Sequence, residues 1–321
     1  MIEHSEMQPG IYAIGIEKTK PPSADHIGSV VFRVEALCGA PGGGNTSEHL
    51  SFVTIDSYGD SGKCDIAPLL STLGDADIVF VLAGLDENDD ILLGRICGAI
   101  FEDSIRTFLV LRDAPEATKA GVTGNVPKAS VDGVIVLGAS SLDTSSTTLS
   151  CDNRDPQALG YLLPPVIRAI ADVIIRPSCV GIDLVDVLDL LCGKLTRFGT
   201  GSAHSGNRPI IATEQAVASL TDQGINLSEI DDVLCNLNGP SSLCMDDFDS
   251  ICHYLHTRFD DDITWFVPIF DDHLGDNIVV NLMATLRVSG CTIPGWIDIC
   301  DRVKRTHHIV RPSMSFCFDD K

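Results

Sequence analysis

The stretch ADIVFVLAGLDENDDILLG, residues 76–94, predicts the fold class. Residues 78–82 contain no polar side chain and indicate a buried strand. A glycine turn at Gly84 and an apolar segment with helical spacing follow, so the stretch indicates a strand, a turn and the start of a helix. This arrangement is common where proteins hold a phosphate. Residues 86–90, however, carry four carboxylates, which repel a phosphate.

The same alternation extends along the chain in both directions. Strands are predicted at residues 11–16, 50–55, 77–82, 107–111, 134–137, 233–237, 263–270 and 277–284. Helices are predicted at residues 24–37, 66–73, 92–101, 159–175, 187–191 and 245–259. The last of these helices carries one apolar stripe, made of Met245, Phe248, Cys252, Leu255 and Phe259. Alternating strands and helices predict an α/β fold with a parallel sheet covered on both faces.

Composition limits the classes of partner. The 321 residues are 44% hydrophobic, enough for two ordinary domains or one large one. The net charge of −23 argues against nucleic acid and anionic membrane surfaces as partners. Asp is far more frequent than Glu, and Lys is scarce, which is typical of a protein from a high-salt cytoplasm where counterions screen self-repulsion.

The twelve cysteines and the apolar segments predict a cytoplasmic location. The cysteines are scattered singly, without a CxxC pair, which favours buried free thiols in a reducing cytosol. The polar residues 1–10 do not resemble a signal peptide. The most apolar run, residues 162–175, contains two prolines, Arg168 and Asp172, so no transmembrane segment is expected.

Several short motifs favour ordinary structural roles. GGGN (42–45) and GDSGKC (59–64) lack the position or spacing of a phosphate loop. Residues 86–97 match the first positions of a calcium loop but fail at its sixth and twelfth positions, so these carboxylates are better explained as caps of the following helix. Cys252 and His256 are better explained as a packed thiol and a surface imidazole than as metal ligands, and residues 271–273 as a turn. No metal site is therefore predicted.

Four stretches in the second half follow one another in the same order as the matching segments of a known protein family. They are IADVIIRPSCVGIDLVDV (170–187), GKLTRFGTGSAHSGNRPIIATEQAVAS (193–219), DDVLCNLNGPSSLCMDDFDSI (231–251) and VPIFDDHLGDNIVVNLMATL (267–286). They resemble, in turn, the end of the central helix with its synergy loop, the next strand and helix, the following strand and helix, and the final strands of FtsZ, the bacterial and archaeal relative of tubulin. The resemblance covers roughly residues 161–286. It implies a tubulin/FtsZ-like two-domain fold.

The first half resembles FtsZ more weakly, at residues 11–16, 50–57 and 74–84. Where the family has GGGTGTG, whose amides cradle the phosphates of GTP, this chain has LDENDDILLG (85–94). Other nucleotide contacts of the family also have no match. The corresponding segments are the loop 17–22, the interval 58–66, the turn 138–140, and the positions near Pro156 and Gly160. The resemblance therefore implies a degenerate nucleotide site.

Two acidic residues of the FtsZ site do have a match in this chain. Asp183 and Asp186 match the acids of the synergy loop, although the preceding Asn of the family is Gly181 here. In FtsZ these acids polarise the water that attacks the nucleotide of the neighbouring subunit, so Asp183 and Asp186 are candidate catalytic residues only in trans. A structural alternative is that Asp183 caps the following helix and Asp186 favours its first turn.

The electrostatic cost of the carboxylates, compared with the free energy of GTP binding, favours loss of that binding. A carboxylate about 4 Å from a phosphate charge costs ~4 kcal/mol at an effective dielectric of 20, and two such contacts cancel most of a micromolar affinity of ~8 kcal/mol. We therefore expect an FtsZ-like cytoskeletal or scaffold protein, a pseudo-GTPase without cofactor, acting in cell division or cell shape. It would assemble with itself, as a filament or homo-oligomer, or with a GTP-loaded FtsZ paralogue.

Three alternatives remain open. One is a nucleotide hydrolase whose acidic loop binds GTP through Mg²⁺, the second is a structural protein unrelated to division, and the third is a fold relic with an unrelated partner. The expected divisions are a degenerate GTPase-like, Rossmann-like domain (1–155), a central helix (156–178) and an FtsZ-like C-terminal α+β domain with a short tail (179–321). The tail has a basic patch and an aromatic end, formed by Arg302, Lys304, Arg305, His307, His308, Phe316 and Phe318. An archaeal, halophilic source is expected.

Overall fold

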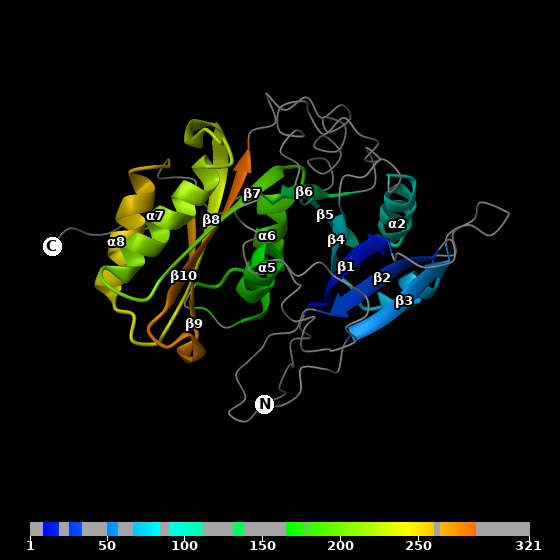
Figure 1. Cartoon of the computed structure of the whole chain (residues 1–321), viewed down its shortest axis with the longest axis horizontal. Helices are drawn as coiled ribbons and strands as arrows, with labels where there is room; N and C mark the ends of the chain where they lie inside the picture. Colours follow the sequence, from blue (N-terminus) through cyan, green and yellow to red (C-terminus); the bar gives the residue numbers. More distant parts are fainter. Residues whose placement is uncertain are drawn as a thin grey trace.

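The computed structural model describes residues 9–18, 26–33, 50–56, 67–83, 90–111, 131–137, 165–176, 178, 180–259 and 264–286, arranged as a long sheet with helices on its faces (Figure 1). The predicted motifs at residues 42–45, 59–64, 138–140 and 156–160, the loop 84–89 and the tail 287–321 lie outside these ranges.

All described strands belong to one ten-stranded sheet in the order β3-β2-β1-β4-β5-β6-β7-β10-β8-β9. The strands are β1 (Ile11–Lys18), β2 (His26–Arg33), β3 (Leu50–Asp56), β4 (Ile78–Ala83), β5 (Arg106–Leu111), β6 (Gly133–Val136), β7 (Leu195–Ala203), β8 (Ile230–Gly239), β9 (Thr264–Phe270) and β10 (Ile278–Leu286). Of the strands described, β2 and β10 alone run against the others. The parallel pairing of β6 with β7 joins the two halves of the chain into a continuous sheet.

The helices form layers on both faces of this sheet. They are α1 (Ala67–Thr72), α2 (Asp90–Glu102), α5 (Pro165–Ile175), α6 (Leu184–Leu191), α7 (Arg208–Thr221) and α8 (Met245–His256). Helices α5 and α6 share one core with strands of both halves, which includes Phe80, Phe108 and Phe198. Helices α7 and α8 share a second core with the last strands, on the left in Figure 1.

Two glycines on β7 let α7 lie unusually close to the sheet. A Cβ atom at Gly199 would overlap the carbonyl oxygen of Ala216, and one at Gly201 would overlap that of Ala212. Since both obstacles are backbone atoms, side-chain rearrangement cannot remove them. The sequence FGTG therefore sets the distance between β7 and α7.

The helix predicted at residues 24–37 is wrong. Residues 26–33 form β2, which pairs antiparallel with β1 and with β3. The apolar spacing at Ile27, Val30 and Val31 suits a helix face, but β-branched residues also favour strands, and pairing on both sides decides the outcome. The expected loop 17–22 changes too, because β1 continues to Lys18. The N-terminal part of the sheet is consequently mixed rather than parallel throughout.

The remaining predicted strands are confirmed within a few residues, as are the helices α1, α2, α6 and α8. Helix α5 begins at Pro165, since proline suits the first position of a helix, and residues 159–164 of the predicted helix lie outside the described ranges. The predicted stripe on α8 is partly wrong: Met245 is 67% exposed, and Ile251 is fully buried. No helix among the described residues is long and apolar enough to cross a membrane. The domain boundaries at 155 and 178 stay predictions.

The cysteines within the described ranges are free thiols. Burial raises the pKa of both Cys97 and Cys192 to about 12, so these thiols are protonated and unreactive at neutral pH. Cys252 is half-buried and His256 is exposed, which fits the packed thiol and surface imidazole predicted for them. Cys244 differs from the expectation of burial, because it is exposed at the start of α8.

Candidate partner-binding site at the start of α6

Asp183 and Asp186 form a reciprocal capping box at the N-terminus of α6. Asp183 Oδ1 accepts hydrogen bonds from the backbone N–H groups of Val185 and Asp186, at 2.8 and 3.0 Å. Asp186 Oδ2 accepts one from the N–H of Asp183, at 3.0 Å. The sequence dictates this arrangement, because an N-cap Asp followed three residues later by a second acceptor satisfies free N–H groups of the first turn. The predicted capping role is confirmed for both residues.

The capping box leaves half of each carboxylate available. Among the described residues, Asp183 Oδ2 and Asp186 Oδ1 have no hydrogen-bond partner. Asp183 is exposed and Asp186 is partly exposed. Val185, between them, is 46% exposed. The start of α6 therefore carries two fixed carboxylate oxygens and an exposed apolar side chain.

The segment that leads into α6 is fixed to the outer edge of β9. Ser178 Oγ donates a hydrogen bond to the carbonyl oxygen of Pro268 at 2.8 Å, and Arg176 Nη2 donates one to that of Phe270 at 3.0 Å. Strand β9 ends the sheet, so its outer carbonyl groups have no strand partner among the described residues. Pro268 has no N–H group, which suits an edge strand. These contacts cover an edge that would otherwise be free to pair with other strands.

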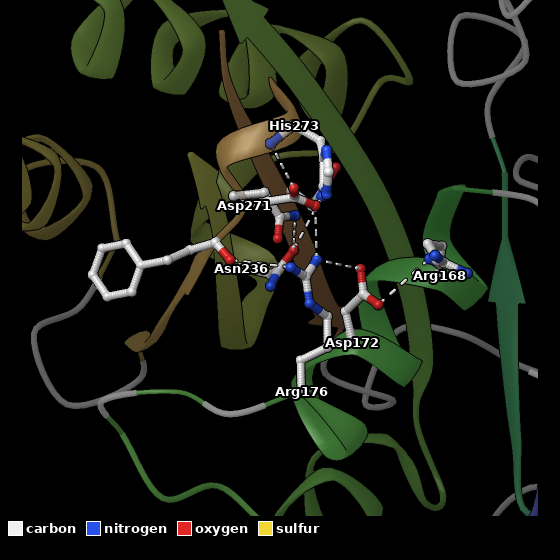
Figure 2. A network of polar contacts seen from close by, with 9 residues as sticks. Arg168, Asp172, Arg176, Asn236, Asp271 and His273 are labelled. Atoms are coloured by element: carbon white, nitrogen blue, oxygen red, sulfur yellow. Dashed lines mark hydrogen bonds and ion pairs between the residues drawn. The ribbon is translucent and has the colours of Figure 1, made fainter. Parts of the chain in front are cut away.

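A buried carboxylate supports this attachment from within (Figure 2). Asp172 lies between Arg168 and Arg176, with Oδ1 at 3.4 Å from Arg168 Nε and Oδ2 at 3.8 Å from Arg176 Nη1. Arg176 Nη1 also contacts Asp271 Oδ2 at 3.1 Å, so it connects α5 with the end of β9. Desolvation raises the pKa of Asp172 despite the two guanidinium groups, and Asp271 adds to the rise.

Buried amides lie on neighbouring strands of the same sheet face. Asn236 is fully buried, and its Oδ1 accepts hydrogen bonds from Asn238 Nδ2 at 2.7 Å and Asn281 Nδ2 at 3.1 Å. Asn236, labelled in Figure 2, lies on β8, which stands between β10 and β9 in the sheet. Asn281 in turn accepts a hydrogen bond from Thr200 at 2.8 Å. These side chains connect β8, β10 and β7 on this face of the sheet.

The carboxyl end of β4 and the carboxyl end of β9, beside which the segment leading into α6 is attached, point in different directions. Six steps separate β4 from β9 in the order β4-β5-β6-β7-β10-β8-β9. Neighbouring strands are rotated by about 20–25°, so the carboxyl ends of β4 and β9 diverge by roughly 120–150°. Figure 1 agrees, since β1 runs toward α2 while β8 and β9 run against the upward arrow of β10.

Comparison with solved structures shows the fold. An FtsZ dimer from M. jannaschii matches with a TM-score of 0.53 and 17% identity, over 69% of this chain and 66% of that one. An FtsZ variant from the same organism gives 0.50 and 18%, over 68% of each chain. The chain has the FtsZ/tubulin fold. The two-domain architecture expected from the resemblance to FtsZ is thus supported at the level of the fold.

Sequence comparison points to the FtsZ/tubulin superfamily as well. The mitochondrial division protein fszA of Dictyostelium discoideum is 27% identical over 234 residues, which are 68% of this chain and 44% of fszA. FtsZ of Buchnera aphidicola is 24% identical over 237 residues, 68% of this chain and 59% of that protein. The chain thus spans about half the length of these relatives. No protein-family model matches it.

Sequence reasoning found the two acids but not the residues that hold them. The residues that hold the acids meet in pairs that are distant in the sequence: Ser178 contacts Pro268, 90 residues away, and Arg176 contacts Asp271, 95 residues away. The sequence offered two signals for these contacts. Arg176 comes directly after an apolar helix, and Asp271 comes directly after a buried strand. The turn predicted at residues 271–273 is confirmed, because Asp271 caps the short 3₁₀ helix Asp272–Leu274. Within the described residues, no three His, Cys, Asp or Glu side chains group as a metal site.

Proposed function

We propose that this chain is an FtsZ-like cytoskeletal or scaffold protein that does not bind or hydrolyse GTP and assembles with itself or with a GTP-loaded FtsZ paralogue. The observation that carries the proposal is the element that follows β1. The antiparallel strand β2 pairs with β1 from Tyr12↔Arg33 to Lys18↔Ile27. A helix N-terminus at this place would offer free N–H groups and a positive dipole to a phosphate, whereas a paired strand offers neither.

The segment after β4 supports the same conclusion from its charge. Parallel strands end at the edge where α/β proteins bind nucleotides, and β4 ends at Ala83 among such strands. The residues that follow include Asp86, Glu87 and Asp89, and Asp90 begins α2. Each carboxylate about 4 Å from a phosphate charge costs ~4 kcal/mol at an effective dielectric of 20. The acids therefore oppose the binding that a glycine-rich loop would favour.

The end of the molecule that carries Asp183 and Asp186 keeps both acids of the FtsZ synergy loop. We infer that a carboxylate in this position acts on a nucleotide only if a partner supplies it, because the carboxyl end of β4 points in another direction. The M. jannaschii FtsZ that shares the fold is described as a dimer, and the sequence relatives are division proteins. These similarities support assembly and a role in cell division or cell shape, whereas the choice of this end rests on Asp183 and Asp186.

Direct titration tests the loss of GTP binding. The full chain is titrated with labelled GTP in the presence of Mg²⁺ at molar salt, beside a GTP-binding FtsZ as positive control. We expect no saturable binding to this chain. A dissociation constant in the low micromolar range, lost when the metal is chelated, would contradict the proposal and favour a hydrolase with a metal-bridged acidic loop.

A further inference from the structure

The start of α8 and the end of β9 form an exposed apolar surface, the α8–β9 patch, made of Met245, Phe248 and Phe270. Met245 is 67% exposed and Phe270 is 38% exposed. The rings of Phe248 and Phe270 meet edge to face with centroids 6.4 Å apart, and Met245 lies one turn before Phe248 on the same side of α8. Single exposed apolar residues are ordinary, but adjacent ones mark interaction surfaces.

The surroundings of the α8–β9 patch are acidic. Asp246 and Asp249 are exposed on α8, and Asp272 is exposed after β9. The backbone N–H of Ser241 donates a hydrogen bond to Asp272 Oδ1 at 2.8 Å and lowers the pKa of that carboxyl, which keeps it ionised. Residues 240–257 and 271–277 contain no Lys or Arg, and the cation beside Phe270, Arg176, is paired with Asp172 and Asp271. The surface therefore fits a segment that combines apolar anchors with positive charge.

We propose that residues 302–318 of the chain itself occupy the α8–β9 patch. Residues 302–311, RVKRTHHIVR, hold four of the chain's 22 Lys and Arg residues and no Asp or Glu. Met314, Phe316 and Phe318 follow at every second position. An extended segment places such alternate side chains on one side, so the three anchors can contact the patch together while the cations face the acidic rim.

The connection is long enough for this contact. Leu286 ends β10 beside Ile230, whereas Phe270 pairs with Gly239 at the other end of β8. The ten residues of β8 separate the two places by about 30 Å, at ~3.3 Å per residue. Residues 287–313 span up to about 90 Å when extended. Because the segment is covalently tethered, its effective concentration at its own patch exceeds that of a second copy in dilute solution.

Photo-crosslinking in the full chain tests this proposal. Benzoylphenylalanine replaces Phe316, the protein is irradiated at low concentration, and the cross-linked site is mapped by mass spectrometry. We expect the cross-link within residues 241–250 or at Phe270. Met245→Asp should lower its yield about tenfold, because it removes the burial of one apolar side chain. The matched control is Phe101→Asp, an exposed phenylalanine on α2 (40% exposed), which should leave the yield unchanged.

A mixture of ¹⁴N- and ¹⁵N-labelled chains identifies the occupant. Cross-linked species of uniform isotope content support the chain's own tail, whereas mixed species show that a second copy occupies the patch and overturn the proposal. A cross-link elsewhere in the chain, or an equal yield with Met245→Asp, also overturns it. Substitution of Arg302 and Lys304 by Glu should lower the yield as well, and an unchanged yield would remove the electrostatic part of the argument. None of these readouts depends on Asp183, Asp186 or GTP.

Discussion

Asp183 and Asp186 each accept a hydrogen bond from the backbone N–H of the other, at 3.0 Å in both directions. This reciprocal contact fixes two carboxylates at the start of α6 and leaves one oxygen of each without a partner among the described residues. The structural and functional explanations of these acids are therefore compatible. A pair of carboxylates held by the backbone is already positioned for a partner molecule, without loss of side-chain freedom on binding.

Breaking the cap should destabilise the fold modestly. Asp183→Ala removes the acceptor for two N–H groups and should lower the free energy of unfolding by about 1 kcal/mol. Asp183→Ser keeps an acceptor and should lose less. Asp189→Ala, at an exposed position farther along α6, is the control and should stay within about 0.5 kcal/mol of wild type. Urea denaturation measures all three, and equal values for Asp183→Ala and Asp189→Ala would show that the cap is energetically silent.

Local pattern predicts most of the elements and the capping role of Asp183 and Asp186, whereas the resemblance to FtsZ identifies these two acids as candidate site residues. Apolar runs identify β4 and β8, and an Asp before an apolar helical segment identifies the cap of α6. The same local reasoning fails at residues 26–33, where the spacing of Ile27, Val30 and Val31 fits two structures and the pairing with β1 and β3 selects the strand.

The rest of the site depends on contacts between distant segments. Ser178 contacts the carbonyl oxygen of Pro268, and Arg176 contacts Asp271, because β9 is the edge strand of the sheet and lies beside the end of α5. The capping of α6 can be inferred from residues 183–186 alone. The attachment of the preceding segment to β9 can be inferred only when the strand order is known. Nothing in the local sequence around Arg176 indicates which acid it contacts.

Asp172 should make stability depend on pH. Burial raises its pKa in the folded state above the ordinary 3.8, so the folded state retains the proton to higher pH than the unfolded state. This contribution to stability is fully present below pH 3.8 and is lost as the pH rises through the folded pKa. Asp172→Asn cannot ionise, so its stability relative to wild type should improve as the pH rises through this window.

Urea denaturation of both proteins between pH 4 and pH 7 gives this difference directly. The comparison removes the titration of the other carboxylates, which both proteins share. A difference that stays constant, or that moves in favour of Asp172 as the pH rises, would show that the arginines outweigh burial.

Gly201→Ala should separate α7 from β7. Its Cβ would overlap the carbonyl oxygen of Ala212, so the two elements must move apart at a cost of about 1–3 kcal/mol. Gly74→Ala is the matched control, because its Cβ would lie 3.7 Å from the nearest atom, the carbonyl oxygen of Ser71. Thermal denaturation should show a clear loss for the first variant and almost none for the second. Equal melting temperatures would mean that the helix can shift freely.

High salt should stabilise the protein. The net charge of −23 produces self-repulsion, which is relieved as the screening length falls to ~3 Å at 1 M salt. The melting temperature should rise by many degrees between low and molar salt. An unchanged midpoint would contradict the expectation that this acidic surface is adapted to a high-salt cytoplasm.

The most direct test of the central claim measures the GTP turnover of a GTP-binding FtsZ from the same cell, mixed with this chain. The decisive variant is Asp183→Ser with Asp186→Gln, because Ser and Gln can keep the capping box while removing both carboxylates. Wild type should change the turnover of the paralogue, and the variant should fold normally but leave turnover at its value without the chain. If the variant changes turnover as much as wild type does, the two carboxylates do not act on the partner's nucleotide and the assignment of this site is wrong.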